Sequence, residues 1–111
     1  MYKRQIKYIL KIQKKYDYII VAVISPLSST RYKAKRIFRE NYYEIYVHCS
    51  KKELLKRDPK GLYALAKKNK LKNLIAFNSK IVYEKSNYKK ITINTEKNNL
   101  QNCVKKIFKK I

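Results

Sequence analysis

The sequence predicts an α/β protein in which three mainly parallel strands are flanked by helices. The first observation is a short, apolar and β-branched run, "YIIVAVIS" at residues 18–25, which is typical of a strand covered on both faces. The second is the alternation of such runs with amphipathic segments, the pattern of parallel strands joined by helical crossovers. The third is the length, because 111 residues suit one domain with a single core.

A helix is predicted at residues 28–41, directly after the strand at 18–25. Ala34, Ile37 and Phe38 recur there at helical spacing. Three hydroxyl side chains open the segment and are N-cap candidates: Ser28, Ser29 and Thr30.

Two more strands and three more helices complete the pattern. The tyrosine-rich alternating segment at 42–50 and the segment at 89–95 are predicted strands. Ser50 is the predicted cap of the next helix. Residues 71–90 lack periodicity, and most of this stretch is predicted to be a loop. The remaining predicted helices are 51–57, 62–70 and 99–111.

The charge of the chain is extreme, with a formal net charge of +22 at pH 7. Such a charge is typical of proteins that bind nucleic acid or anionic membranes. Only five of the 29 basic residues are arginine, the side chain best suited to phosphate and guanine, and the lysines are spread along the chain. This pattern favours the codon usage of an AT-rich genome over a polynucleotide partner.

Neither a metal site nor a membrane segment is predicted. Cys49 and Cys103 lie far apart without CxxC spacing, and His48 is the single histidine. Two thiols in a reducing compartment is the economical interpretation. The longest apolar run, residues 18–24, has the length of a strand, and no signal-peptide pattern is present, so we expect a cytoplasmic location.

Two short motifs are candidates for chemistry. Ser25 leaves the carboxyl end of the first predicted strand before the rigid Pro26, where ligands of parallel sheets bind; Ser-Pro is also a common way to end a strand. The second motif, "RDPKGLY" at residues 57–63, contains Gly61, the only glycine. That glycine supplies a backbone conformation closed to other residues, allows close approach of a ligand, or simply forms a turn between helices.

These motifs resemble the carboxyl-terminal part of the adenylylsulfate (APS) kinase family. The similarity covers residues 6–111 and includes "ISP" at 24–26, Arg31, "RDPKGLY" and the pair Tyr83-Glu84. Members transfer the γ-phosphoryl group of ATP to the 3′-hydroxyl of adenosine 5′-phosphosulfate (APS), a step of sulfate assimilation. The resemblance implies a three-layer P-loop kinase fold, ATP with Mg²⁺, a homodimer when full length, and no nucleic-acid or membrane partner.

The resemblance also implies site residues. Ser25 corresponds to the serine described in bacterial members as a phosphoserine intermediate. Arg57 lies where a guanidinium contacts the adenine of the nucleotide, a stacking role that suits arginine better than lysine. The other matched positions bind the APS substrate: Arg31, Gly61, Leu62 and the lid lysine Lys72.

Departures from the family pattern bear on the substrate. The aromatic residue and the arginine that follow Ser-Pro in the family are Leu27 and Ser28 here. The family's lid continues with an aromatic residue and Thr-Gly-Ile-Asp, whereas residues 74–78 read "LIAFN", so the stacking ring is missing or displaced to Phe77. A related P-loop kinase for another small substrate is the alternative. A basic nucleic-acid-binding α/β module, with affinity that falls steeply with salt, is the alternative from another class.

The phosphate-binding loop of P-loop kinases is absent from these 111 residues. A GxxxxGK[ST] loop needs two glycines, and the chain has one. Lysines elsewhere do not replace the nest of backbone N–H groups that surrounds the phosphates. In the family this loop lies upstream, on a strand between those represented by residues 18–25 and 42–50. We therefore expect residues 6–111 to be a portion of the kinase domain that is inactive alone.

Residues 1–5, "MYKRQ", are expected to come from a sequencing adapter. The codons GTG-TAT-AAG-AGA-CAG encode them and match the end of a transposon adapter used in sequencing libraries. The alternative is that Lys3, Arg4 and Lys7 simply begin an amphipathic helix. Finding the same residues in an intact genomic copy of the gene would refute the adapter hypothesis.

Overall fold

A two-stranded parallel sheet forms the centre of the protein, whose computed structural model describes residues 2–74 and 80–111. The strands are β1 (Ile45–His48) and β2 (Ile91–Asn94), paired so that Ile45 lies opposite Ile91. Parallel strands need a long crossover, which here contains two short helices. The predicted α/β class with parallel pairing is confirmed.

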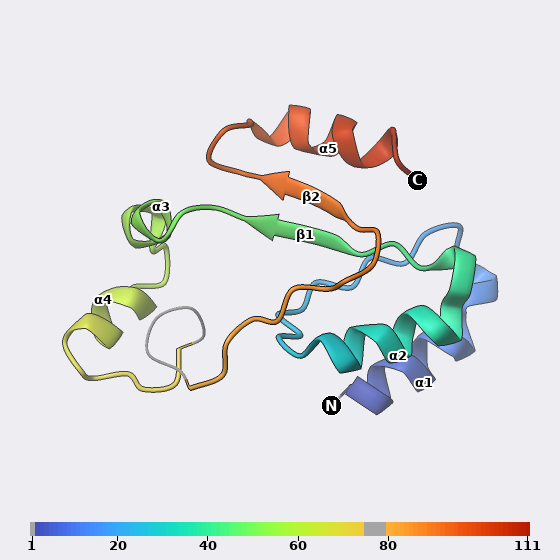
Figure 1. Cartoon of the computed structure of the whole chain (residues 1–111), viewed down its shortest axis with the longest axis horizontal. Helices are drawn as coiled ribbons and strands as arrows, with labels where there is room; N and C mark the ends of the chain where they lie inside the picture. Colours follow the sequence, from blue (N-terminus) through green and yellow to red (C-terminus); the bar gives the residue numbers. More distant parts are fainter. Residues whose placement is uncertain (1, 75–79) are drawn as a thin grey trace.

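Helices surround the sheet on several sides. The helices are α1 (Tyr2–Ile12), α2 (Ser28–Phe38), α3 (Lys51–Arg57), α4 (Leu62–Lys67) and α5 (Leu100–Phe108). Two 3-10 turns, Gln13–Lys15 and Arg39–Asn41, follow α1 and α2. In Figure 1, α5 lies next to β2, α1 and α2 run side by side on the opposite side of the molecule, and α3 and α4 follow the carboxyl end of β1.

The strand predicted at residues 18–25 does not form. These residues have no regular secondary structure, and Ile20 is 93% exposed. A strand exists through hydrogen bonds to a neighbouring strand, and within the described residues β1 is paired with β2 alone. The prediction is wrong because β-branched apolar residues give a propensity for strands, whereas strand formation needs a paired edge.

The packed core is small. Ile91 and Ile93 of β2 are buried with Cys103 of α5, and Ile107 packs against them. None of the described large side chains is fully buried, and Val47 of β1 remains 60% exposed. Helix α5 thus covers β2, while apolar surface of β1 stays in contact with solvent.

The cap of α2 differs from the prediction. Its N-cap residue is Leu27, which offers no capping side chain. The carboxylate of Glu84 instead accepts hydrogen bonds from the backbone N–H and the hydroxyl of Ser28, at 2.8 Å each. Thr30 donates its hydroxyl proton to the carbonyl oxygen of Leu27 at 2.8 Å. The predicted caps are wrong because a carboxylate 56 residues away fills their role, whereas Ser50 caps α3 as predicted.

Candidate functional site

The residues with predicted roles fall in three places. Ser25 and Arg31 lie together at the start of α2, where Arg31 Nη1 donates to the carbonyl oxygen of Ser25. Three others lie together where α3 joins α4: Arg57, Gly61 and Leu62. The predicted lid lysine is exposed in the stretch after α4 and is Lys72.

The connection between α3 and α4, residues 57–63, is here called the α3–α4 joint. Gly61 has a φ of +64°, a left-handed conformation that other residues rarely adopt. The carboxylate of Asp58 accepts the N–H groups of Tyr63 at 3.1 Å and Ala64 at 2.9 Å, which caps the first turn of α4. A Cβ on Gly61 would meet nothing within 4 Å. In this structure the need for glycine therefore comes from the backbone conformation.

Arg57 connects the α3–α4 joint to Thr95, the residue that follows β2. Its Nε donates to Glu53 at 2.8 Å, and its two terminal nitrogens donate to the hydroxyl and the carbonyl oxygen of Thr95 at 2.9 Å each. The N–H groups of a guanidinium point outward in its plane, so three such bonds fix the orientation of the plane. The side chain keeps 42% exposure, which leaves part of it open to a stacking partner.

Around Arg31 the structure assembles a buried polar cluster. Arg31, Glu44 and Ser86 are 6%, 8% and 6% exposed. Arg31 Nε lies 3.4 Å from Glu44 Oε1, which also accepts the hydroxyl of Ser86 at 2.6 Å. Tyr88 donates its hydroxyl to the other oxygen of Glu44. A buried ion pair is tolerated when its remaining polar atoms are hydrogen-bonded, and this network meets that condition.

The guanidinium of Arg31 also binds backbone. Its Nη1 donates to the carbonyl oxygen of Ser25, and its Nη2 donates to the carbonyl oxygen of Glu84. Its Cζ lies 4.6 Å from the centre of the Tyr83 ring. A substrate contact by Arg31, as the resemblance implies, would require some of these contacts to be exchanged.

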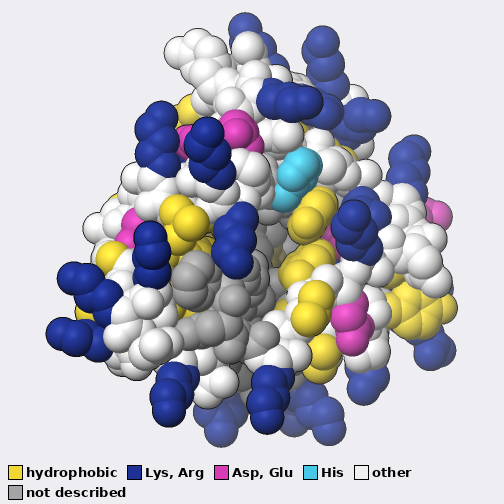
Figure 2. All heavy atoms as spheres, turned by 60° about the vertical axis from the view of Figure 1, so that its left-hand side comes forward, with side chains coloured by type: hydrophobic (Ala, Val, Ile, Leu, Met, Phe, Trp, Pro, Cys, Tyr) yellow, Lys and Arg dark blue, Asp and Glu magenta, His cyan; other side chains and the backbone are white. Residues whose placement is uncertain are grey.

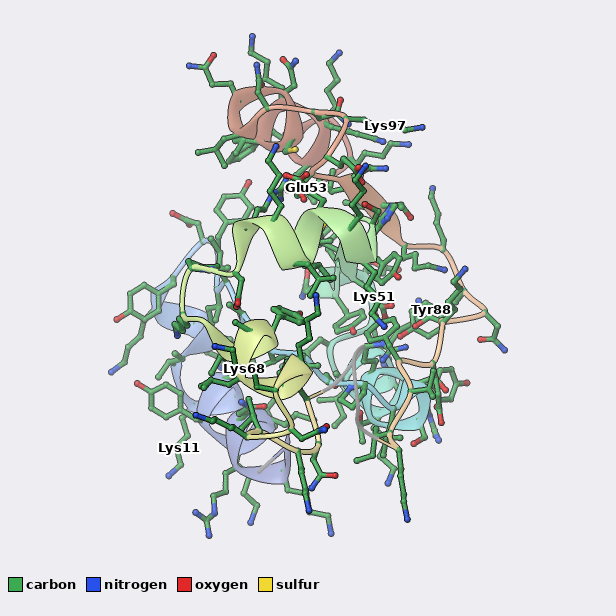
Figure 3. The ribbon with its side chains drawn as sticks, turned by 90° about the vertical axis from the view of Figure 1, so that its left-hand side faces the viewer. Lys11, Lys51, Glu53, Lys68, Tyr88 and Lys97 are labelled. Carbon is green, nitrogen blue, oxygen red and sulfur yellow. The ribbon has the colours of Figure 1, made fainter. Side chains whose placement is uncertain are left out.

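Glu44 and Ser86 were not identified from the sequence. No motif marks them, because their roles depend on contacts between segments 42 to 55 residues apart. Burial raises the pKa of Tyr88, and its hydrogen bond to Glu44 raises that pKa further. Figure 3 shows Tyr88 beside α2, where its ring lies 6.2 Å from that of Tyr32.

Neither the described residues nor the composition supply the phosphate and metal part of a kinase site. Within residues 2–74 and 80–111 no three His, Cys, Asp or Glu side chains gather as metal ligands would. With one glycine in the chain there is no phosphate-binding loop. Residues 75–78 of the predicted lid, with Phe77, lie outside the described residues. Among the described helices, none has the length and apolar character needed to cross a membrane.

The basic side chains do not gather in one patch on the face that Figure 2 shows, where lysines and arginines surround the whole outline. The labelled lysines of Figure 3 come from separate parts of the chain: Lys11 of α1, Lys51 of α3, Lys68 after α4 and Lys97 after β2. Dispersed lysines are typical of a solvated surface rather than of a phosphate-tracking stripe.

Comparison with known proteins identifies a matching family and several similar proteins. The family model for adenylylsulphate kinase matches residues 3–94. The adenylyl-sulfate kinase of Clostridium acetobutylicum is 34% identical over 88 residues, which cover 79% of this chain and 43% of that protein. The cytidine diphosphoramidate kinase of Campylobacter jejuni is 36% identical over 93 residues, covering 84% of this chain and 53% of that protein. No solved structure matches.

The chain therefore spans about half the length of the curated relatives it matches. A probable adenylyl-sulfate kinase of Aeropyrum pernix agrees, at 32% identity over 81% of this chain and 50% of that protein. The family match extends over both strands, β1 and β2, and over the whole α3–α4 joint. On this evidence the chain belongs to the adenylylsulphate kinase family.

Proposed function

We propose that this chain is the nucleotide-contacting portion of a kinase that transfers the γ-phosphoryl group of ATP to a hydroxyl group of a small nucleotide substrate, with APS as the first candidate. The observation that carries the proposal is the α3–α4 joint. There the guanidinium plane of Arg57 is fixed by Thr95 with the side chain still partly exposed, next to the left-handed Gly61. A fixed cationic plane is suited to stacking on a nucleobase.

The roles proposed for the site residues follow the family resemblance. Arg57 stacks on the adenine of ATP, and Ser25 lies at the phosphoryl-transfer centre. Gly61 and Leu62 approach the substrate nucleotide through their backbone. Lys72, exposed on the stretch after α4, faces the charged groups of the substrate.

These 111 residues alone do not carry out the transfer in this proposal. Phosphoryl transfer is mostly positioning and electrostatics, and it needs a phosphate cradle and a magnesium site. The chain has one glycine, and its described residues hold no metal-ligand group. ATP with Mg²⁺ is therefore expected to bind only to a longer protein that supplies both.

A second candidate substrate is a cytidine diphosphate derivative. The relative from Campylobacter jejuni, named a cytidine diphosphoramidate kinase, is 36% identical to this chain, as similar as the APS kinase relatives. The chain also departs from the APS kinase pattern at Leu27, Ser28 and residues 74–78. The resemblance places the stacking ring of the lid against the substrate base, so a change there is what a different nucleobase requires.

The test uses the longest reading frame that contains this chain. ADP release is measured with ATP and Mg²⁺ in the presence of APS, of cytidine diphosphoramidate and of neither. Turnover with APS supports the first candidate, and turnover with the cytidine compound alone supports the second. The 111-residue chain is assayed in parallel, and it is expected to release no ADP with either substrate. A folded, ATP-binding protein that turns over neither compound contradicts both candidates.

The nucleic-acid alternative is tested with the 111-residue chain. Binding to a fluorescent single-stranded DNA is titrated at several salt concentrations. A nucleic-acid module retains affinity at physiological salt, whereas a dispersed lysine surface gives only weak binding that disappears as salt rises.

A further inference from the structure

Ser25 holds an unusual backbone conformation. Its φ is 38°, in the region that residues with a side chain rarely adopt. The other described non-glycine residues with positive φ are two asparagines, Asn69 and Asn73, and Arg39 at the end of α2. Asparagine tolerates this region, but serine before a proline has no such advantage. Contacts from the surrounding structure must therefore maintain the turn at Ser25.

Arg31 and Glu84 supply those contacts. Arg31 donates to the carbonyl oxygens of Ser25 and Glu84, so one guanidinium bridges the two segments. The N–H of Glu84 donates to the carbonyl oxygen of Pro26 at 2.8 Å, and its carboxylate accepts from Ser28. We call these five residues, Ser25, Pro26, Ser28, Arg31 and Glu84, the Ser25 clasp.

The guanidinium of Arg31 is itself fixed from three sides. Glu44 lies 3.4 Å from Nε, the Ser86 hydroxyl lies 3.2 Å from Nε and from Nη2, and the Tyr83 ring covers one face. With the residue only 6% exposed, its contacts are to the protein. Arg31 is thus built to hold backbone rather than to receive an anion.

The clasp also fixes the direction of the Ser25 hydroxyl. Ser25 Oγ lies 3.2 Å from Thr30 Oγ1. Thr30 already donates its own proton to the carbonyl oxygen of Leu27, so in this pair Ser25 is the donor and Thr30 the acceptor. The oxygen of Ser25 is left with its lone pairs facing away from Thr30.

We propose that Arg31 is a positioning residue that, through the Ser25 clasp, sets the place and direction of the Ser25 hydroxyl for the reaction instead of contacting the substrate. This inference rests on the proposed kinase function. It replaces the substrate contact that the family resemblance implies for Arg31, and it adds Glu84 and Thr30 as residues that act through Ser25.

The kinetic test compares two arginines of α2 in the longest reading frame that contains this chain. Arg31→Lys removes the fork that reaches Ser25 and Glu84 together, because an ammonium is a single point donor. We expect kcat to fall by about 100-fold, as for a displaced reacting group, with an unchanged KM for the nucleotide substrate. Arg36→Lys, at an exposed position of the same helix, leaves both constants unchanged. A raised KM with unchanged kcat in Arg31→Lys overturns the proposal, since it indicates a substrate contact.

A second readout does not depend on activity. In a ¹⁵N-labelled 111-residue chain, left-handed residues give a strong intraresidue NOE between the amide and α protons. We expect Arg31→Lys to weaken this NOE at Ser25 and to leave it at Asn73. Glu84→Gln weakens it less, and the matched cap variant Glu96→Gln, whose carboxylate binds Ser50 in the same way, leaves it unchanged. An unchanged NOE at Ser25 in Arg31→Lys overturns the proposal.

Thr30→Val covers the case in which Arg31→Lys does not fold. Valine has the shape of threonine but accepts no hydrogen bond, so the Ser25 turn stays and its hydroxyl loses direction. We expect a lower kcat with the Ser25 NOE retained, and an unchanged kcat counts against the proposal. If the unmodified protein turns over no substrate, the proposed function fails, while the NOE experiment still decides whether Arg31 holds the Ser25 turn.

Discussion

The guanidinium of Arg57 holds Thr95 by two hydrogen bonds of 2.9 Å, one to the hydroxyl and one to the carbonyl oxygen, across 38 residues of sequence. The bonds fasten the last residue of α3 to the residue that follows β2. They join the α3–α4 joint to the carboxyl end of the sheet, where parallel α/β proteins bind ligands.

Arg57→Lys should separate the stability of this connection from its role in binding. A lysine cannot bond to Glu53 and to both oxygens of Thr95, so we expect the free energy of unfolding to fall by about 1 kcal/mol in urea titrations. In the longest reading frame, loss of the guanidinium face should weaken ATP binding by about fivefold in calorimetry. Lys52→Ala, on the same helix, is the control for both. Unchanged ATP affinity would remove the proposed stacking role.

Gly61→Ala should cost about 1–2 kcal/mol of unfolding free energy, because alanine resists the left-handed conformation. Gly61→Asn should cost less, since asparagine tolerates that conformation and the structure leaves space for a side chain. Thermal or urea unfolding of the two variants checks the order. If Gly61→Asn folds normally but the longer protein loses substrate affinity, a ligand approaches this backbone and conformation alone does not explain the glycine.

Glu44→Gln should be among the most damaging single substitutions. It leaves the buried guanidinium of Arg31 without its counter-charge, for which we expect a loss of about 3–5 kcal/mol in unfolding free energy. In the double variant Arg31→Met, Glu44→Gln the total loss should be smaller than the sum of the two single losses, because removing either partner already removes the ion pair. Glu40→Gln, at an exposed position, should change stability by less than about 0.5 kcal/mol. Additive losses in the double variant would show that the two side chains are not coupled.

Acid should weaken the protein through two matched carboxylates. Hydrogen bonds from Ser28 and Ser50 lower the pKa of Glu84 and Glu96 from the ordinary value of 4.5. The stability that each contributes is complete above its unfolded-state pKa and is lost as pH falls through the lower folded-state pKa. The urea concentration at the unfolding midpoint should therefore decrease as the pH drops below about 5. This decrease should be smaller in Glu84→Gln and in Glu96→Gln. If the midpoint decreases as steeply in both variants as in the unmodified protein, the acid sensitivity comes from other titrating groups.

The absence of the strand predicted at residues 18–25 leads to a further prediction. Ile20 is 93% exposed, so Ile20→Ser should leave the unfolding free energy within about 0.5 kcal/mol and reduce self-association in sedimentation experiments. Ile93 is 2% exposed, and Ile93→Ala should cost about 2–5 kcal/mol. Equal losses for the two would mean that residues 18–25 are packed in solution.

The sequence by itself determined the local elements and the family. Helical periodicity located α2, α4 and α5, and α3 was located by its cap Ser50, whose partner lies one turn away. "RDPKGLY" identified the joint between α3 and α4, since Pro59 restricts the backbone and Gly61, two residues later, permits a left-handed turn. Each of these features depends on residues that are neighbours in the chain.

Tertiary structure decided everything that depends on distant partners. Residues 18–25 have strand propensity but no paired edge, so they form no strand. The cap of α2 comes from Glu84, 56 residues from Ser28, and Arg31 bonds to Ser86 across 55 residues and to Glu84 across 53. A carboxylate or a guanidinium binds whichever group the fold brings within about 3 Å, and sequence spacing does not encode that distance. Which residues hold Ser25 was therefore settled by the fold alone.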